Sequence, residues 1–128
     1  MSRTSELLKL SGVEAAGLFS RKAYLEEFEG GLTEAEAVEM ASLCTAILMT
    51  MEMQGRLLGR MAGQSGWDSC YGWMTWGPEM AIVTIHDSMC LVQGRQASFN
   101  QVIKAMTESA NAEMIKPGGK GEPNASIG

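Results

Sequence analysis

Histidine is almost absent from this sequence, and cysteine is sparse. The only histidine is His86, and the three cysteines, Cys44, Cys70 and Cys90, stand far apart without a CxxC spacing. A metal site needs three or four converging ligands, and a single histidine cannot supply a histidine-rich set. A histidine-rich metal site is therefore excluded, and we expect no metal or other cofactor. An odd number of widely spaced cysteines is typical of reduced thiols in the cytoplasm and does not predict a disulfide framework.

Positive charge and long apolar runs are also scarce. The chain has 10 Lys and Arg residues against 15 Asp and Glu residues, which gives a formal net charge of -5. Nucleic acids and anionic membrane surfaces are bound by clustered basic residues, so neither is expected as a partner. No segment approaches the roughly 18 consecutive apolar residues of a membrane span, and the apolar N-terminal stretch is too short and too charged for a signal peptide. These features predict a cytoplasmic protein.

No proline precedes Pro78, which leaves room for one long helix. Thr33 and Glu36 form a capping-box pattern, in which the Thr hydroxyl accepts a hydrogen bond from a free backbone amide and the Glu reaches back to the cap. We therefore predict a single helix over residues 33–62. At about 1.5 Å per residue, this helix would be roughly 45 Å long.

The predicted helix is apolar on more than one side. One row of side chains consists of Ala37, Met40, Cys44, Ile47, Met51, Leu58 and Met61, and a second consists of Val38, Leu43, Ala46, Met49, Met53 and Leu57. A helix that covers one face of a sheet needs one apolar stripe, so the second stripe needs a second surface to cover it. We therefore expect a homodimer whose interface includes Val38, Met49, Met53 and Leu57.

Shorter elements surround this helix. Apolar periodicity and turn residues predict a helix over residues 2–10, strands over 13–20, 23–29, 69–76, 80–86 and 89–95, and a last helix over 98–113. The economical arrangement of these elements is an α+β domain with a five-stranded antiparallel sheet. We expect one domain over residues 1–114, followed by a disordered tail over 115–128 that has almost nothing to bury.

The run Gly12–Phe19, the capped helix from Thr33 and the three strands between 69 and 95 resemble the roadblock/LC7 family. The resemblance covers about residues 4–112. It implies the element order α-β-β-α-β-β-β-α of this profilin-like fold, in a divergent prokaryotic member. It also implies a dimer joined by the long helices and by edge-to-edge pairing of the third strand. Small Ras-like GTPases or larger assemblies are the partners that it implies, and the family has no common catalytic constellation to transfer.

The strand predicted over 69–76 is unusually rich in aromatic residues, which departs from the family pattern. Alternation along a strand places Tyr71 and Trp73 on one face and Trp76 on the other. Aromatic side chains are common in cores and enriched at interfaces, so we assign Tyr71 and Trp73 to the dimer interface or the core. A surface that stacks on a flat ligand is the alternative.

Cys70, His86 and Cys90 are the candidates for a ligand or thiol site. A nucleophilic thiol needs a base within reach, and His86 followed by Asp87 supplies the residue types for one. These two residues fall at a predicted turn between strands, where polar residues are usual, so the structural interpretation is preferred.

The sequence as a whole predicts a non-enzymatic, homodimeric scaffold or regulatory module, with a small Ras-like GTPase as the partner that the resemblance implies. Two alternatives stay open. One is a small-ligand sensor of similar fold, which would have a closed apolar cavity beside the sheet. The other is a thiol-dependent redox accessory protein, which would hold a thiol of lowered pKa in a cleft.

Overall fold

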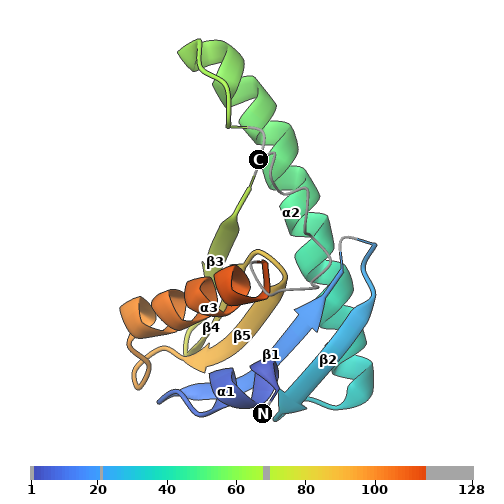
Figure 1. The fold of residues 1–128 in the computed structure, drawn as a ribbon, viewed down its shortest axis with the longest axis vertical. Helices are drawn as coiled ribbons and strands as arrows, with labels where there is room; N and C mark the ends of the chain where they lie inside the picture. Colours follow the sequence, from blue (N-terminus) through green and yellow to red (C-terminus); the bar gives the residue numbers. More distant parts are fainter. Residues whose placement is uncertain (1, 21, 68–69, 115–128) are drawn as a thin grey trace.

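The computed structural model describes residues 2–20, 22–67 and 70–114. Its elements follow the predicted order (Figure 1): α1 (Arg3–Leu8), β1 (Val13–Phe19), β2 (Leu25–Gly30), α2 (Glu34–Ala62), β3 (Gly72–Trp76), β4 (Met80–Ile85), β5 (Ser88–Gln93) and α3 (Phe99–Met114). The predicted α+β class is confirmed. The tail for which we predict disorder, 115–128, lies outside the described residues.

The five strands form one antiparallel sheet in the order β2-β1-β5-β4-β3. The strands β2 and β3 are therefore the two edges, although they are consecutive in the sequence. Their connection has to cross the whole sheet, and α2 provides that crossing.

Helices cover both faces of the sheet (Figure 1). The short α1 and the C-terminal α3 pack on one face, where Ala16, Val83, Cys90, Val102 and Met106 belong to the larger core cluster. The helix α2 packs on the other face, over a second cluster formed by Phe19, Ala41, Cys44, Trp73 and Met89. The strand β4 contributes buried side chains to both faces, as its nearly continuous apolar sequence predicts.

The connection from β1 to β2 is longer than the two residues left between the predicted strands 13–20 and 23–29. Two backbone hydrogen bonds of Ser20 close the connection. The Ser20 carbonyl accepts from the Ala23 amide, and the Ser20 amide donates to the Tyr24 carbonyl. Ala23 takes a φ of 69°, in the left-handed region, so it cannot continue a strand. The strand β2 therefore begins at Leu25 and not at residue 23.

The capping box of α2 is formed as predicted. The Glu36 amide donates to the Thr33 hydroxyl over 3.1 Å, and the Thr33 amide donates to Glu36 Oε1 over 2.9 Å. The helix ends at Gly63, whose φ of 68° is the left-handed conformation that glycine adopts most easily. Within the described ranges, no helix is both long and apolar enough to cross a membrane.

Candidate functional site

The buried thiols are in environments that keep them protonated. Cys90 lies on β5 in the core beneath α3, and burial raises its pKa to about 12. Cys44 lies on α2 against the opposite face, 3.7 Å from the Thr84 hydroxyl, and burial raises its pKa to about 11. A neutral buried thiol is a poor nucleophile, so both residues act as small apolar core side chains.

Cys70 is only half-buried, but it also lacks the features of a reactive thiol. It packs against the α2-side core, and its thiol donates a hydrogen bond to the Gly72 carbonyl over 3.4 Å. Burial raises the pKa of Cys70, and the negative charge of Glu52 raises it further. A redox thiol needs the opposite environment, in which positive charge stabilises the thiolate.

His86 and Asp87 form the β4–β5 turn, as predicted, and each has a structural partner. The His86 ring stacks on Tyr71 with a centroid distance of 5.9 Å. Asp87 accepts two hydrogen bonds from the guanidinium of Arg3, over 2.9 and 3.0 Å, while Arg3 Nε donates to Ser109. The Arg3 side chain of α1 therefore links the turn to α3.

The structure does not assemble Cys70, His86 and Cys90 into one site. Cys90 lies in the core on the α3 face, Cys70 packs on the α2 face, and His86 is exposed at the turn. Among the residues that the structure describes, no group of three His, Cys, Asp or Glu side chains could hold a metal ion.

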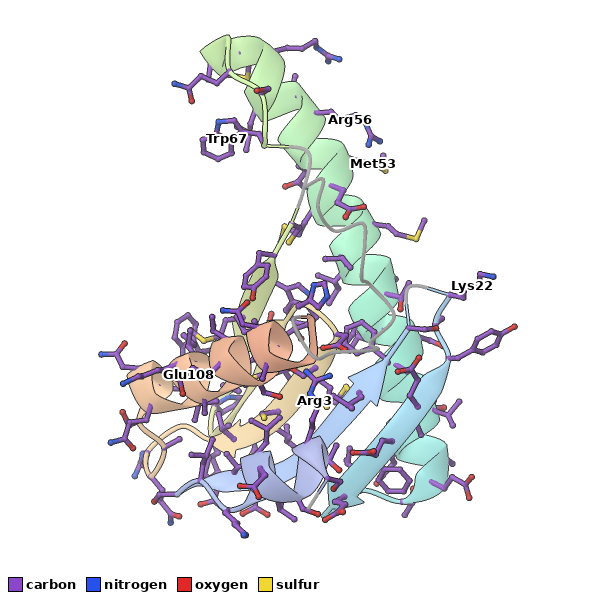
Figure 2. All side chains as sticks on the ribbon, viewed as in Figure 1. Arg3, Lys22, Met53, Arg56, Trp67 and Glu108 are labelled. Carbon is purple, nitrogen blue, oxygen red and sulfur yellow. The ribbon has the colours of Figure 1, made fainter. Side chains whose placement is uncertain are left out.

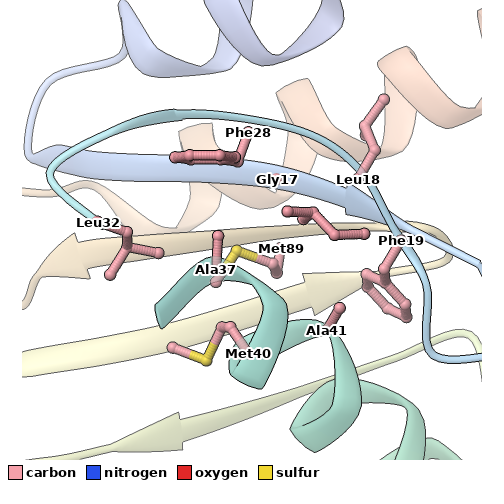
Figure 3. A pocket seen from close by; sticks show the side chains of 10 residues that line it. Gly17, Leu18, Phe19, Phe28, Leu32, Ala37, Met40, Ala41 and Met89 are labelled. Atoms are coloured by element: carbon pink, nitrogen blue, oxygen red, sulfur yellow. The ribbon is translucent and has the colours of Figure 1, made fainter. Parts of the chain in front are cut away.

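An apolar pocket lies between the first turns of α2 and the strands β1 and β2 (Figure 3). Phe28, Leu32, Met40 and Met89 line it together with backbone at Gly17. Its volume is about 10 Å³, which is the space of one water molecule and not of an organic ligand. This pocket gives no support to the ligand-sensor alternative.

The sheet leaves the second half of α2 uncovered. The helix has 29 residues and is therefore roughly 43 Å long, whereas five strands spaced about 4.8 Å apart span only roughly 20 Å. Its buried residues accordingly end at Leu48, with the single exception of Gly55. Figure 1 shows that the C-terminal part of α2 extends past the sheet.

We call the part of α2 beyond Leu48 the overhanging segment. The chain folds back at the end of this segment. The Gln64 amide donates to the Gly59 carbonyl over 3.1 Å, and a side chain at Gly59 would meet the Gln64 carbonyl oxygen at 3.0 Å. An open cleft of about 450 Å³ lies here, bordered by Arg56, Arg60 and Trp67. Figure 2 labels Arg56 and Trp67 on this part of the molecule. Glycine at position 59 allows this close return of the backbone.

The overhanging segment exposes many apolar side chains. Met53 is 62% exposed and Leu57 is 49% exposed, and Met53 projects from the helix in Figure 2. The exposed large apolar residues of α2 are Val38, Leu43, Met49, Met51, Met53, Leu57, Leu58 and Met61. Exposed apolar side chains in this number need an explanation, because clustered ones are typical of interaction sites.

Five of the six residues assigned to a dimer interface lie on the protein surface, and one does not. Val38, Met49, Met53, Leu57 and Tyr71 are exposed. Trp73, by contrast, is only 9% exposed and packs between the sheet and the first half of α2. It belongs to the core because its face of β3 is the one that α2 covers. The assignment of the exposed five to a dimer interface stays a prediction.

The two edge strands differ in how they are protected. In β2, Glu26, Glu27 and Glu29 place charge along the edge, which discourages pairing with another strand. The strand β3, Gly72–Trp76, carries neither charge nor proline, and Trp76 is exposed on it. An uncharged apolar edge of this kind is a template for pairing with another chain.

Sequence reasoning missed the charged ends of α2. Arg56 and Arg60 near its end and Glu34, Glu36 and Glu39 at its start are all exposed. A count of charge along the helix axis would have found this separation, whereas sorting residues by helical face concealed it.

Comparison with known proteins adds a family and a fold. A family model described as "Uncharacterized conserved protein (DUF2173)" matches residues 3–108. No curated protein sequence matches the chain.

Several solved structures are similar. One described as MglB with tetrameric arrangement is 16% identical, with a TM-score of 0.70 over 86% of this chain and 81% of that one. The gliding protein MglB from Thermus thermophilus is 15% identical, with a TM-score of 0.69 over 86% and 82%. A roadblock/LC7 domain from Streptomyces avermitilis is 17% identical, with a TM-score of 0.67 over 86% and 90%. These likenesses confirm the roadblock/LC7 fold.

Proposed function

The chain belongs to the DUF2173 family of uncharacterized conserved proteins, and we propose that it is a homodimeric, protein-binding regulatory module without catalytic activity of its own. The observation that carries this proposal is the exposed apolar surface on the second half of α2. A single domain leaves these side chains in water, because the sheet beneath the helix is too short to cover them.

Covering this surface would contribute substantially to association. Fully burying a Leu or Met side chain contributes roughly 1.5–3 kcal/mol, so covering a half-exposed one contributes about 1 kcal/mol. Met49, Met53, Leu57 and Met61 are each about half-exposed or more. Two copies would therefore gain enough from this surface to offset much of the entropy lost on association.

The unprotected edge of β3 supports the same proposal. Pairing with the β3 of a second copy would satisfy backbone groups that the edge leaves without a strand partner. The resemblance to the roadblock/LC7 family implies this pairing, and one of the similar structures is described with a tetrameric arrangement.

Sedimentation equilibrium at micromolar concentration tests the homodimer. We expect a species of twice the 13.8 kDa chain mass, with the monomer appearing on dilution. A monomer across the whole concentration range would refute the proposal.

A small Ras-like GTPase is the partner class that the resemblance implies. The experiment mixes the purified protein with the small GTPases of its own host and follows both complex formation and GTP turnover. We expect a complex with at least one of them, and no hydrolysis by the protein alone. Failure with every GTPase would remove this partner class and leave the protein-binding module in place.

A further inference from the structure

A row of glycines lines one side of the end of α2. Gly55, Gly59 and Gly63 follow one another at steps of four, so they share one side of the helix, and all three line the cleft of about 450 Å³ described above. The chain returns against this row, since the Gln64 amide donates to the Gly59 carbonyl over 3.1 Å. A Cβ atom at Gly59 would lie 3.7 Å from the Trp67 Cβ, so Trp67 begins directly beside the helix.

Arg56 and Arg60 border the same cleft one helical turn apart. Residues at positions i and i+4 of a helix have Cβ atoms about 5–6 Å apart, so both guanidinium groups can reach one bound group. Within the described ranges 2–20, 22–67 and 70–114, neither arginine side chain has an ion pair or a hydrogen bond, and no acidic residue lines the cleft. The cleft is therefore a local concentration of positive charge on a chain whose formal net charge is -5.

Stabilisation of the helix end explains only one of the two arginines. The carbonyl groups at the C-terminus of a helix carry partial negative charge, which basic residues in the last turn offset. Arg60 lies in the last turn of α2, whereas Arg56 lies more than one turn before the final helical residue, Ala62. The effect of the helix dipole falls off within the last turn, so it gives no reason for Arg56 to lie beside the cleft.

Trp67 supplies a flat apolar surface in the cleft. Its indole N–H donates to Gln64 Oε1 over 3.4 Å, which orients the ring on the loop, and the residue is 48% exposed. In the part of the chain that the structure describes, no other ring stacks on it. A half-exposed tryptophan ring beside cationic groups is a surface on which planar rings of ligands stack.

We propose that this cleft binds a small organic anion that carries a planar ring. Arg56 and Arg60 hold the anionic group, because a guanidinium can donate two parallel N–H bonds to a phosphate or a carboxylate. The planar ring stacks on Trp67, and the absence of side chains at Gly55 and Gly59 leaves room for the ligand beside the helix. The volume of about 450 Å³ lies within the roughly 300–1,000 Å³ of clefts that bind small molecules. One chain forms the site, so this inference goes beyond the proposed function and does not depend on a homodimer.

Two-dimensional NMR of the three tryptophan indole N–H groups measures the binding. Adenosine monophosphate is one probe, because it joins a planar base to a phosphate, and indole-3-acetate is the other, because it joins a planar ring to a carboxylate. The spectrum of Trp67→Phe assigns the Trp67 signal. We expect this signal to shift saturably with at least one probe, while the signals of the buried Trp73 and of Trp76 at the other end of β3 stay in place.

The probe with the lower dissociation constant identifies the anionic group as a phosphate or a carboxylate. Failure of both probes to shift the Trp67 signal, or equal shifts of Trp67 and Trp76, would overturn the proposal. The separate parts of the probes are adenosine and inorganic phosphate for the first, and indole and acetate for the second. Each part should bind at least tenfold more weakly than the joined probe, and a part that binds equally tightly would show that the ring and the anion are not held together.

Substitutions in the cleft test the assigned roles. Arg56→Gln and Arg60→Gln each remove one charge and should raise the dissociation constant roughly tenfold, with a smaller effect at high salt. Trp67→Ala should raise it by a similar factor. Arg95→Gln is the matched control, because Arg95 is exposed on the β5–α3 connection, and it should leave the dissociation constant unchanged. If the two arginine variants lower the melting temperature but not the affinity, the arginines only stabilise α2 and the proposal is wrong.

Met49→Glu separates this inference from the proposed function. Met49 is 57% exposed and lies about two turns before Arg56, so a glutamate there should dissociate the proposed homodimer without entering the cleft. We expect the monomeric variant to bind the same probe with an unchanged dissociation constant. Loss of binding in this variant would show that a second copy completes the site, which would overturn the inference. A wild-type protein that is already monomeric and binds the probe refutes the homodimer and supports the cleft.

Discussion

Met53→Glu is the substitution that examines the role of α2 most directly. Met53 is 62% exposed in the single chain, so a glutamate there stays in water and should not disturb the folded monomer. In a dimer that covers this side chain, the same glutamate has to lose its water without gaining a partner. The substitution therefore separates association from folding.

The expected effect is large. Each copy loses the burial of the exposed part of one Met side chain, which is about 1–2 kcal/mol. Burying an unpaired carboxylate costs several kcal/mol more, even when water relieves part of the penalty. Two symmetric sites together give at least ~4 kcal/mol, and since each 1.4 kcal/mol is tenfold, the dissociation constant should rise by roughly a thousandfold.

Sedimentation equilibrium measures the dissociation constant, and circular dichroism measures the thermal stability of the variant. Tyr24→Glu is the matched control, because Tyr24 is similarly exposed but lies on the β1–β2 connection. It should leave association unchanged, and Glu39→Ala should have a much smaller effect than Met53→Glu. If Met53→Glu and Tyr24→Glu behave alike, the overhanging segment of α2 is not the interface, and the reasoning from its exposure fails.

Three further predictions concern stability. Thr33→Ala removes one half of the capping box and should lower the free energy of unfolding by about 1 kcal/mol in urea denaturation; an unchanged midpoint would show that the cap contributes nothing. Asp87→Asn weakens the two hydrogen bonds from Arg3 and should cost about 1 kcal/mol, seen as a lower melting temperature that high salt does not restore. Burial raises the pKa of Cys44 to about 11 and that of Cys90 to about 12, above the ordinary value of 9.0. The neutral thiols therefore contribute their full stabilisation below pH 9, and this stabilisation is lost as the pH rises toward 11 and 12. Unfolding in reducing buffer should therefore become easier above pH 9, and less so in Cys90→Ala, whereas an identical pH dependence of the two proteins would contradict this assignment.

The sequence by itself determined the elements and their order. The Thr33–Glu36 capping box specified the start of α2 to within one residue, because a helix cap acts through local hydrogen bonds. The absence of proline before Pro78 left room for the helix to be long. The polar pair His86–Asp87 between two apolar runs specified the β4–β5 turn in the same way. A helix start or a turn of this kind can be predicted from the sequence because the interactions that form it join residues close together in the chain.

Tertiary structure decided which apolar surfaces are covered. Alternation along β3 placed Trp73 and Trp76 on opposite faces, but only the position of α2 made Trp73 a core residue and left Trp76 exposed. Similarly, the two apolar rows on α2 showed that two surfaces must cover the helix, but they did not show how far along the helix the sheet reaches. The sheet covers α2 only as far as about Leu48, because the sheet is about half as wide as the helix is long.

Contacts between distant residues were likewise decided by the fold. Arg3 binds Asp87 and Ser109 because the sheet brings α1, the β4–β5 turn and α3 together. No local sequence pattern predicts such a contact. The same packing separates Cys70 from Cys90 by placing them on opposite faces of the sheet. A sequence specifies which residue types are present and which local structure they prefer, but the approach of side chains far apart in the chain depends on how the layers pack.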